Sequence, residues 1–224
     1  MAAVTQARWD PRRLNAVSVT MPEGVTPPGT RGRLLHAALK LFAELGFNGT
    51  SIRDIAAEVG INSATLYAHY RSKEHVLADL VLIGHQELHS RLQESLIEAG
   101  GDPAAQLVAL VRTQVLVHTD FPLLALVANQ ELHALSPEQA APALALRKQS
   151  REIAAGVIAS GVRRGAFHVT DPALAGLAIA SMGVRVASWF GPDQPYTREQ
   201  VADAFTEFAL RIVGAEAPST EQRG

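Results

Sequence analysis

Residues 50–73, TSIRDIAAEVGINSATLYAHYRSK, contain the pattern that decides the fold. Ser51 is a predicted helix N-cap, and Gly60 is placed to end the short helix that follows it. A link of only three residues separates this helix from a second one, predicted over 63–70. Because two short helices joined so tightly must cross steeply, with Leu66 facing inward, the pattern predicts a helix-turn-helix.

The outward face of the second helix indicates what that helix contacts. Its side chains are small or polar, and they are Ser63, Ala64, Thr65, His69 and, at an angle, Tyr67. Groups of this kind approach base edges and phosphates in the major groove of DNA. A larger residue in place of Ala64 would hold the helix away from the groove. The second helix is therefore predicted to be a DNA-recognition helix.

This segment resembles the signature of the TetR/AcrR family of transcriptional regulators. The matching positions are Ile55, Ala56, Gly60, Ile61, Leu66, Tyr67, His69, Tyr70, Ser72, Lys73 and Glu74. In the preceding helix the matches are Phe42, Ala43, Gly46, Phe47 and Thr50. The resemblance covers residues 31–80. It departs from the family over 62–64, where a glycine or proline often stands third, and this departure affects the DNA sequence preference.

The resemblance implies a set of DNA-binding residues. They are Thr50, Ser51, Arg53, Asn62, Ser63, Ala64, Thr65, Tyr67, His69, Tyr70 and Lys73. Arg53 and Thr65 are expected to reach bases or phosphates, while Tyr67, Tyr70 and Lys73 hold the DNA backbone. The first three residues of the recognition helix are the candidates for base readout, because base contacts carry sequence preference. For the two tyrosines a half-buried structural position is the alternative.

The rest of the chain predicts one helix after another, without the alternation of a strand. Proline stands where the first turn of a helix tolerates it at Pro103, Pro122, Pro137 and Pro172. Ser72 is a predicted cap for a long helix that reaches residues 100–101, and Thr197 begins a capping-box pattern for the last helix. The expected fold is all-α, with about nine helices.

We expect an N-terminal three-helix helix-turn-helix domain followed by a larger helical domain for ligand binding and dimerisation. The predicted parts are a flexible N-terminal arm (1–29), the DNA-binding domain (30–75), the effector-binding and dimerisation domain (76–214) and a flexible tail (215–224). Charge follows this division, since 31–75 carry six basic and four acidic residues while 76–224 carry eleven and sixteen. A basic head on an acidic body is typical of a DNA-binding regulator.

Composition excludes several other classes of protein. The chain has 224 residues, of which 47% are hydrophobic and 19% charged, so it can bury a core. It has no cysteine, which excludes disulfides, thiolate metal sites and a cysteine nucleophile. No signal peptide or membrane span is predicted, and we expect a cytoplasmic protein. Because no phosphate-binding loop or nucleophile elbow is present, we expect no enzyme and no cofactor.

The last two predicted helices are the candidates for a homodimer interface. Their proposed contact residues are Ala180, Gly183, Phe205, Phe208 and Ile212. The helix over 172–190 is rich in small residues, which permit close helix approach. Packing of the same residues inside one subunit is an equally strong interpretation. A dimer would place two recognition helices in successive major grooves, about 34–36 Å apart.

The resemblance also implies an effector pocket in the larger domain. The proposed ligand-binding residues are His118, Phe121, Leu126, Asn129, Gln130, His133, Met182, Arg185 and Trp189. Most inward positions are apolar, which predicts a small apolar effector, such as an acyl-coenzyme A or a related lipid or steroid metabolite. Arg185 binds an anionic ligand group in one interpretation, and pairs with Asp203 or Glu207 in another.

His85 and His89 lie one helical turn apart and could share a metal ion. No third ligand accompanies them, so we interpret them as histidines of the helix surface, and no metal is expected. The predicted function is a ligand-responsive repressor that binds a palindromic operator as a homodimer. The alternatives are a helix-turn-helix regulator controlled by a protein partner and, less favoured, a helical enzyme.

Overall fold

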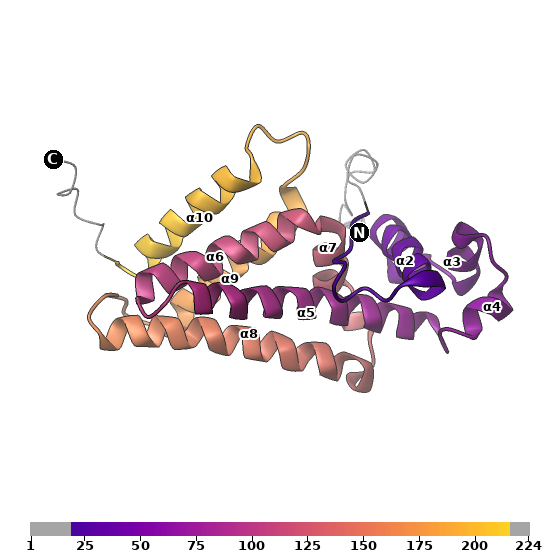
Figure 1. Cartoon of the computed structure of the whole chain (residues 1–224), viewed down its shortest axis with the longest axis horizontal. Coiled ribbons are helices and arrows are strands. Elements are labelled where there is room, and N and C mark those ends of the chain that lie inside the picture. Colours follow the sequence, from indigo (N-terminus) through magenta and orange to yellow (C-terminus); the bar gives the residue numbers. More distant parts are fainter. Residues whose placement is uncertain (1–18, 216–224) are drawn as a thin grey trace, which may run out of the picture. The chain divides into compact units, whose positions relative to one another are not determined.

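The computed structural model describes residues 19–215, and the elements in this range are helical (Figure 1). They are α2 (Gly29–Gly49), α3 (Ile52–Val59), α4 (Ser63–Tyr67), α5 (Lys73–Glu98), α6 (Pro103–Asp120), α7 (Pro122–Gln130), the 3-10 helix η1 (Leu132–Ala134), α8 (Pro137–Arg163), α9 (Pro172–Trp189) and α10 (Arg198–Ile212). Within the described range this amounts to nine α-helices and no strand, so the predicted all-α fold is confirmed.

Two compact units are formed. Unit 1 contains the described residues up to Gly84, together with Phe121–Ala141 and Ala187–Gln194. Unit 2 contains His85–Asp120, Pro142–Val186 and the described residues from Pro195 onward. The helix-turn-helix segment therefore lies in unit 1, with α7 and the first part of α5. The predicted boundaries at residues 30, 75 and 214 stay predictions.

The core of unit 1 consists of apolar side chains on the inner faces of its helices. The largest fully buried ones include Leu34, Leu35, Leu39, Phe42, Ile55, Leu66, Leu77, Leu80 and Leu124. α2 packs against both α3 and α7. The two short helices α3 and α4 are anchored through Ile55, Ala56 and Leu66, which leaves their other faces exposed.

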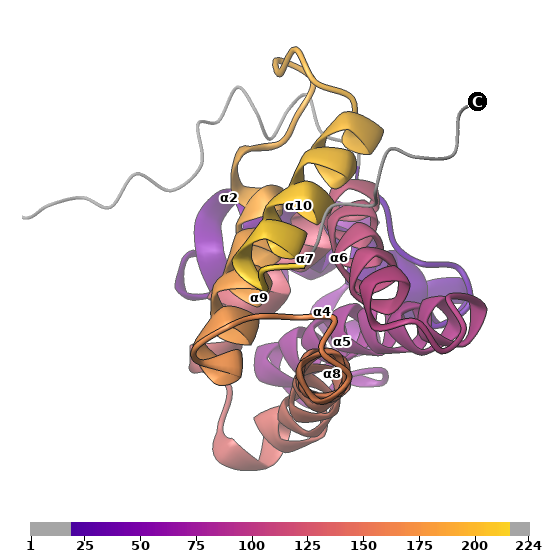
Figure 2. The same cartoon turned by 90° about the vertical axis from the view of Figure 1, so that its left-hand side faces the viewer.

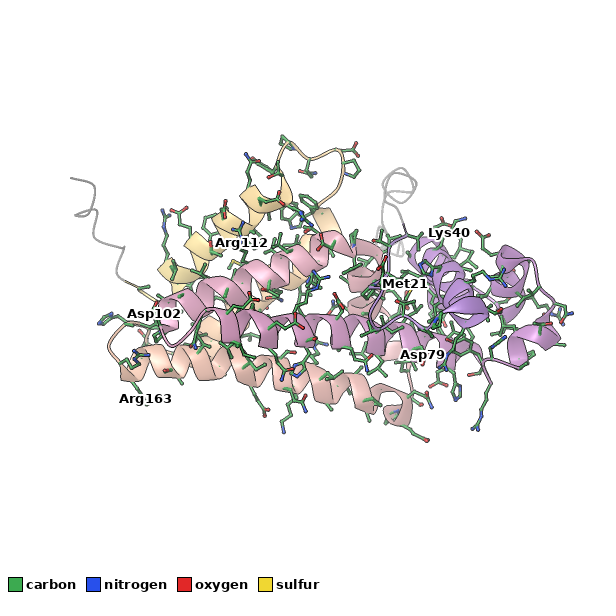
Figure 3. The ribbon with its side chains drawn as sticks, viewed as in Figure 1. Met21, Lys40, Asp79, Asp102, Arg112 and Arg163 are labelled. Carbon is green, nitrogen blue, oxygen red and sulfur yellow. The ribbon has the colours of Figure 1, made fainter. Side chains whose placement is uncertain are left out.

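Unit 2 has a separate apolar core. Its buried members are Leu92, Leu107, Leu110, Val111, Val157, Ile158, Phe167, Ala175, Ile179, Ala209 and Val213. These residues come from α5, α6, α8, α9 and α10, and from the loop after α8, so all five helices share one core (Figure 2). Arg112, labelled in Figure 3, connects α6 to α10 by an ion pair with Asp203.

Local signals in the sequence placed most helix boundaries correctly. The four proline-started helices α6, α7, α8 and α9 begin at the predicted prolines. The capping boxes at Ser51 and Thr197 are formed, and Gly60 ends α3 with φ 75° and ψ 30°, where a residue without Cβ is favoured. Helix boundaries that depend on such short-range interactions are the part of a fold that is easiest to predict from the sequence.

Two boundaries differ from the prediction. Gly46 was expected to end the first helix with a left-handed conformation; it has the expected positive φ (75°, with ψ 166°) and interrupts the helix, but a further turn continues beyond this kink to Gly49. The recognition helix was expected over 63–70 and ends at Tyr67, since Tyr70 turns into the core.

The predicted arm and tail lie mostly outside the described residues. Of the arm, residues 19–29 are described, and Gly29 already belongs to α2. Met21, labelled in Figure 3, is buried, and Thr26 Oγ1 donates a 2.5 Å hydrogen bond to Pro22 O. This end of the predicted arm is therefore packed. Within 19–215 no single helix combines the length and apolar composition of a membrane span, although α6 and α7 pass that test together as a bent pair.

Candidate functional site

Short-range hydrogen bonds fix the start of each helix of the helix-turn-helix. Asp54 N donates to Ser51 Oγ at 3.2 Å, and Ser51 N donates to Asp54 Oδ2 at 2.7 Å, which closes the capping box of α3. At the start of α4, Thr65 N donates to Asn62 Oδ1 at 2.8 Å. Both helices therefore begin at side-chain caps.

The outer face of α4 is open to solvent. Leu66 is fully buried and fixes the rotation of the helix, so the opposite face projects outward. The exposed members of the predicted set are Ser51, Arg53, Asn62, Ala64, Thr65, Tyr67 and His69, while Ser63 is half-buried. Tyr67 retains 54% of its accessible surface. These residues lie at the start of α3, in the turn, and on or just after α4, where they are accessible to DNA.

Two of the predicted DNA contacts, Thr50 and Lys73, direct their polar atoms into unit 1 instead. Thr50 is 2% exposed, and its Oγ1 donates to Gly46 O at 3.0 Å. Lys73 Nζ donates to Phe47 O at 2.6 Å and to Thr50 O at 2.7 Å. Burial lowers the pKa of the Lys73 ammonium group. The polar atoms of Thr50 and Lys73 are thus engaged within unit 1, where they close the end of α2.

Tyr70 also differs from the prediction, because it is 4% exposed. Its hydroxyl donates to Asp79 Oδ2 at 2.8 Å and accepts from Arg31 Nε at 3.1 Å. Burial raises the pKa of the Tyr70 hydroxyl above its usual range, so this group stays protonated and acts as a donor. The structural alternative for Tyr70 thus describes its position better than a contact with the DNA backbone.

One candidate contact was missed in the sequence. Arg71 lies shortly after the end of α4 at Tyr67 and is exposed, like Arg53 on α3. Neither side chain makes an ion pair with any residue of the described range, whereas Lys40 pairs with Glu58 at 2.7 Å. Arg71 is therefore as available to a phosphate as Arg53. The position next to the recognition helix was the signal that could have identified it.

The predicted dimer residues divide between inner and outer faces. Gly183 is buried against the side chain of Gln114, where a Cβ would clash, and Ala180 O accepts from Gln114 Nε2 at 3.2 Å. Those two residues serve packing inside unit 2, because α6 approaches α9 closely there. Phe208 is exposed, while Phe205 and Ile212 are half-buried against the unit 2 core.

A different part of α9 is exposed and apolar. Leu174 and Leu177 keep 63% and 62% of their accessible surface. Phe208 on α10 is a third large apolar side chain of unit 2 that is exposed. We call Leu174, Leu177 and Phe208 the outer apolar face. Large apolar side chains that are exposed on two helices of one unit are candidates for an interaction surface.

The predicted ligand-binding residues belong to both units. Unit 1 holds Phe121, Leu126, Asn129, Gln130, His133 and Trp189, and unit 2 holds His118, Met182 and Arg185. Leu126 and His118 are buried, whereas Gln130, His133 and Arg185 are exposed. Asp203 and Glu207, the two predicted partners of Arg185, form ion pairs with Arg112 and Arg211 respectively. The proposed ligand role of these nine residues stays a prediction.

The comparisons with known proteins agree with this arrangement. The family model described as bacterial regulatory proteins of the tetR family matches residues 34–80, and the Tetracyclin repressor-like C-terminal domain matches residues 100–213. The HTH-type transcriptional repressor KstR2 of Rhodococcus jostii (strain RHA1) is 30% identical over 184 residues, which are 81% of this chain and 90% of that protein.

Solved structures share this helical fold over most of the chain. A bacterial regulatory protein in the tetR family from Rhodococcus RHA1 matches with a TM-score of 0.78 and 32% identity, over 83% of this chain and 97% of that chain. AibR, solved in complex with isovaleryl coenzyme A and operator DNA, matches with a TM-score of 0.73 and 23% identity, over 82% of this chain and 97% of that chain.

The helical fold and the exposed recognition helix define a DNA-binding regulator of the helix-turn-helix class. Both family models and the relatives point to the same group of these regulators. The chain belongs to the TetR family of bacterial transcriptional regulators.

Proposed function

We propose that this TetR-family regulator is a repressor that binds a palindromic operator as a homodimer and is released by a small apolar effector. The observation that carries the proposal is the exposed face of α4, with the free arginines Arg53 and Arg71 on either side of it in sequence. Small side chains at 63–65 let the helix approach base edges, while the arginines neutralise phosphates.

The homodimer follows from the geometry that operator recognition needs. One recognition helix of five residues contacts few base pairs and binds DNA weakly. A second copy of the protein on the other half-site of a palindrome would increase the affinity. The outer apolar face of Leu174, Leu177 and Phe208 is the surface that we assign to this contact. Two copies related by a two-fold axis would bury these side chains against each other.

Repression is proposed because a dimer on an operator beside a promoter blocks polymerase, and because KstR2 is named as a repressor. A reporter gene under the promoter of the chain's own upstream region tests this direction of control. Expression of the wild-type protein should lower reporter output, and deletion of its gene should raise it. Lower transcription of the bound targets after deletion would contradict repression and indicate an activator.

An acyl-coenzyme A, or a related lipid or steroid metabolite, is the proposed class of effector. AibR was solved with isovaleryl coenzyme A and operator DNA, which makes acyl thioesters the first probes to use. Titration of the protein–operator complex with a panel of acyl-coenzyme A compounds tests this proposal, because the active compound should release the DNA. DNA binding that no compound changes would favour control by a protein partner instead.

A further inference from the structure

His85, on α5, has an unusual environment in unit 2. It is 8% exposed, and its Nε2 atom makes no hydrogen bond with any described residue. Within 19–215, His85 Nε2 is the only buried side-chain nitrogen or oxygen atom that has no hydrogen-bond partner. The interpretation of His85 as a histidine of the helix surface was therefore wrong. A buried polar atom without a partner destabilises the folded protein, and such atoms are rare in native structures.

Other polar groups of unit 2 lie around this imidazole. His118 on α6 is 3% exposed, and its Nδ1 contacts Gln114 O at 2.8 Å. Arg147 on α8 is half-buried, and both its charge and that of a protonated His118 act on His85. Three helices thus bring polar side chains together in unit 2, whose core is otherwise apolar.

The neighbouring histidine on the same helix is satisfied by contrast. His89 Nδ1 lies 3.1 Å from Ser150 Oγ on α8, close enough for a hydrogen bond. His89 therefore has a partner within the protein, although it lies only one turn from His85. The difference between the two residues is specific to the surroundings of His85 and is not a general property of this face of α5.

The charge state of His85 limits which ligand atom suits it. Burial, together with the positive charge of Arg147 and with His118, lowers the pKa of His85 to about 4. The imidazole is therefore neutral at pH 7 and can present an N–H at Nε2. Arg147 makes the electrostatic potential near His85 positive, which favours a hydrogen-bond acceptor on the ligand over a hydrogen-bond donor.

We propose that His85 is the polar anchor of the effector site, and that its Nε2 donates to an oxygen acceptor on a ligand whose remainder is apolar. Carbonyl oxygens of a ketone or thioester and the oxygens of a carboxylate share this chemistry. This inference deepens the proposed function, on which it rests, because it assigns the hydrogen-bonding residue and the ligand atom that it selects. The helices that carry His85, His118 and Arg147 otherwise contribute apolar side chains to the core of unit 2, an environment that suits the apolar remainder of such a ligand.

The first test needs no ligand and compares H85L with H89L in thermal unfolding. Leucine has a similar volume to histidine and leaves no unsatisfied nitrogen. H85L should melt at or above the temperature of the wild type, whereas H89L, which loses its contact with Ser150, should melt lower. A drop for H85L as large as that for H89L would identify His85 as a structural residue and overturn the inference.

The second test uses octanoyl coenzyme A, 2-octanone, octanoate and octane as matched probes, with tryptophan fluorescence and operator release as readouts. H85L should weaken binding of the oxygen-bearing probes about five- to tenfold, the effect of one lost hydrogen bond, and leave octane unchanged. H89L should bind all probes like the wild type. The ketone, thioester and carboxylate arms then show which oxygen acceptor His85 selects.

The outcomes separate this inference from the proposed function. If the wild type binds the oxygen-bearing probes and H85L binds them equally well, the effector site stands but His85 does not anchor it. If H85L weakens octane as much as 2-octanone, the change acts through shape and the hydrogen bond is refuted. If the wild type binds no probe and its operator complex is unaffected, the proposed apolar effector fails, and the anchor fails with it.

Discussion

The hydroxyl of Tyr70 donates a 2.8 Å hydrogen bond to Asp79 Oδ2, which ties the segment after the recognition helix to α5. Arg31, in the first part of α2, donates to the same carboxylate oxygen at 2.6 Å. Three separate segments of unit 1 are thereby joined at one carboxylate. The position of α4 is fixed by this junction as well as by Leu66, so the recognition helix is held in a defined orientation.

Replacing Tyr70 by phenylalanine tests the role of this junction. Y70F keeps the ring and removes the hydroxyl, so we expect the free energy of unfolding to fall by about 1–2 kcal/mol. Urea denaturation of the DNA-free protein measures this change. If Y70F unfolds like the wild type but binds its operator more than tenfold more weakly, the hydroxyl contacts DNA, as the family resemblance implied.

Lys73 gives a second test of an inward-facing residue. K73M keeps the apolar stem but removes the ammonium group that donates to Phe47 O and Thr50 O. Because charged hydrogen bonds to the carbonyls at the end of α2 are lost, stability should fall by about 2–3 kcal/mol. The salt dependence of operator binding should remain that of the wild type. A shallower salt dependence with unchanged stability would instead place Lys73 on a phosphate.

Arg53 and Arg71 should behave in the opposite way. R53A and R71A should leave thermal stability nearly unchanged, while each lowers the slope of log affinity against log salt by about one. Fluorescence anisotropy over a series of salt concentrations measures the slope. K40A is the matched control, because Lys40 already pairs with Glu58, and it should change the slope less. Equal slopes for all three variants would exclude Arg53 and Arg71 as phosphate contacts.

The outer apolar face can be tested by charge. L177E places a carboxylate in the proposed dimer contact, so the protein should sediment as a monomer in analytical ultracentrifugation. L144E is the control, since Leu144 on α8 is also exposed but lies outside the proposed contact, and it should remain dimeric. A wild-type monomer, or a dimer that survives L177E, would exclude this surface.

The buried histidine predicts a pH dependence of stability. In the unfolded chain His85 binds a proton near pH 6.5, whereas in the folded state its pKa is about 4. The unfolded state therefore gains a proton first, and stability is lost as pH falls from 6.5 toward 4. Between pH 7 and pH 5 the wild type should lose about 2 kcal/mol more than H85L. Parallel urea titrations at both pH values measure the difference, and equal losses would contradict the lowered pKa.

The sequence predicted the helices well because their ends are local. Pro103, Pro122, Pro137 and Pro172 each fix the backbone at the first turn, and no distant contact is needed to set that boundary. The capping boxes at Ser51 and Thr197 have the same local origin. The order of helices and their class thus followed from chemistry within a few residues.

The side that each residue faces could not be predicted in the same way. Tyr70 and Lys73 match the family motif at their positions, but their contacts with Asp79 and Phe47 come from other segments. The small residues of α9 left open which face is inward, and Gly183 packs on Gln114 while Leu177 is exposed. His85 and His89 likewise form one pattern in sequence, and only packing separates them.

Operator binding is tested most directly by a titration of the wild-type protein against labelled DNA from its own upstream region, at two salt concentrations. We expect saturable binding of a dimer to a palindromic site, steep weakening at the higher salt, and release by an acyl-coenzyme A. Binding that does not distinguish this DNA from a scrambled fragment would show that the protein is not an operator-specific repressor.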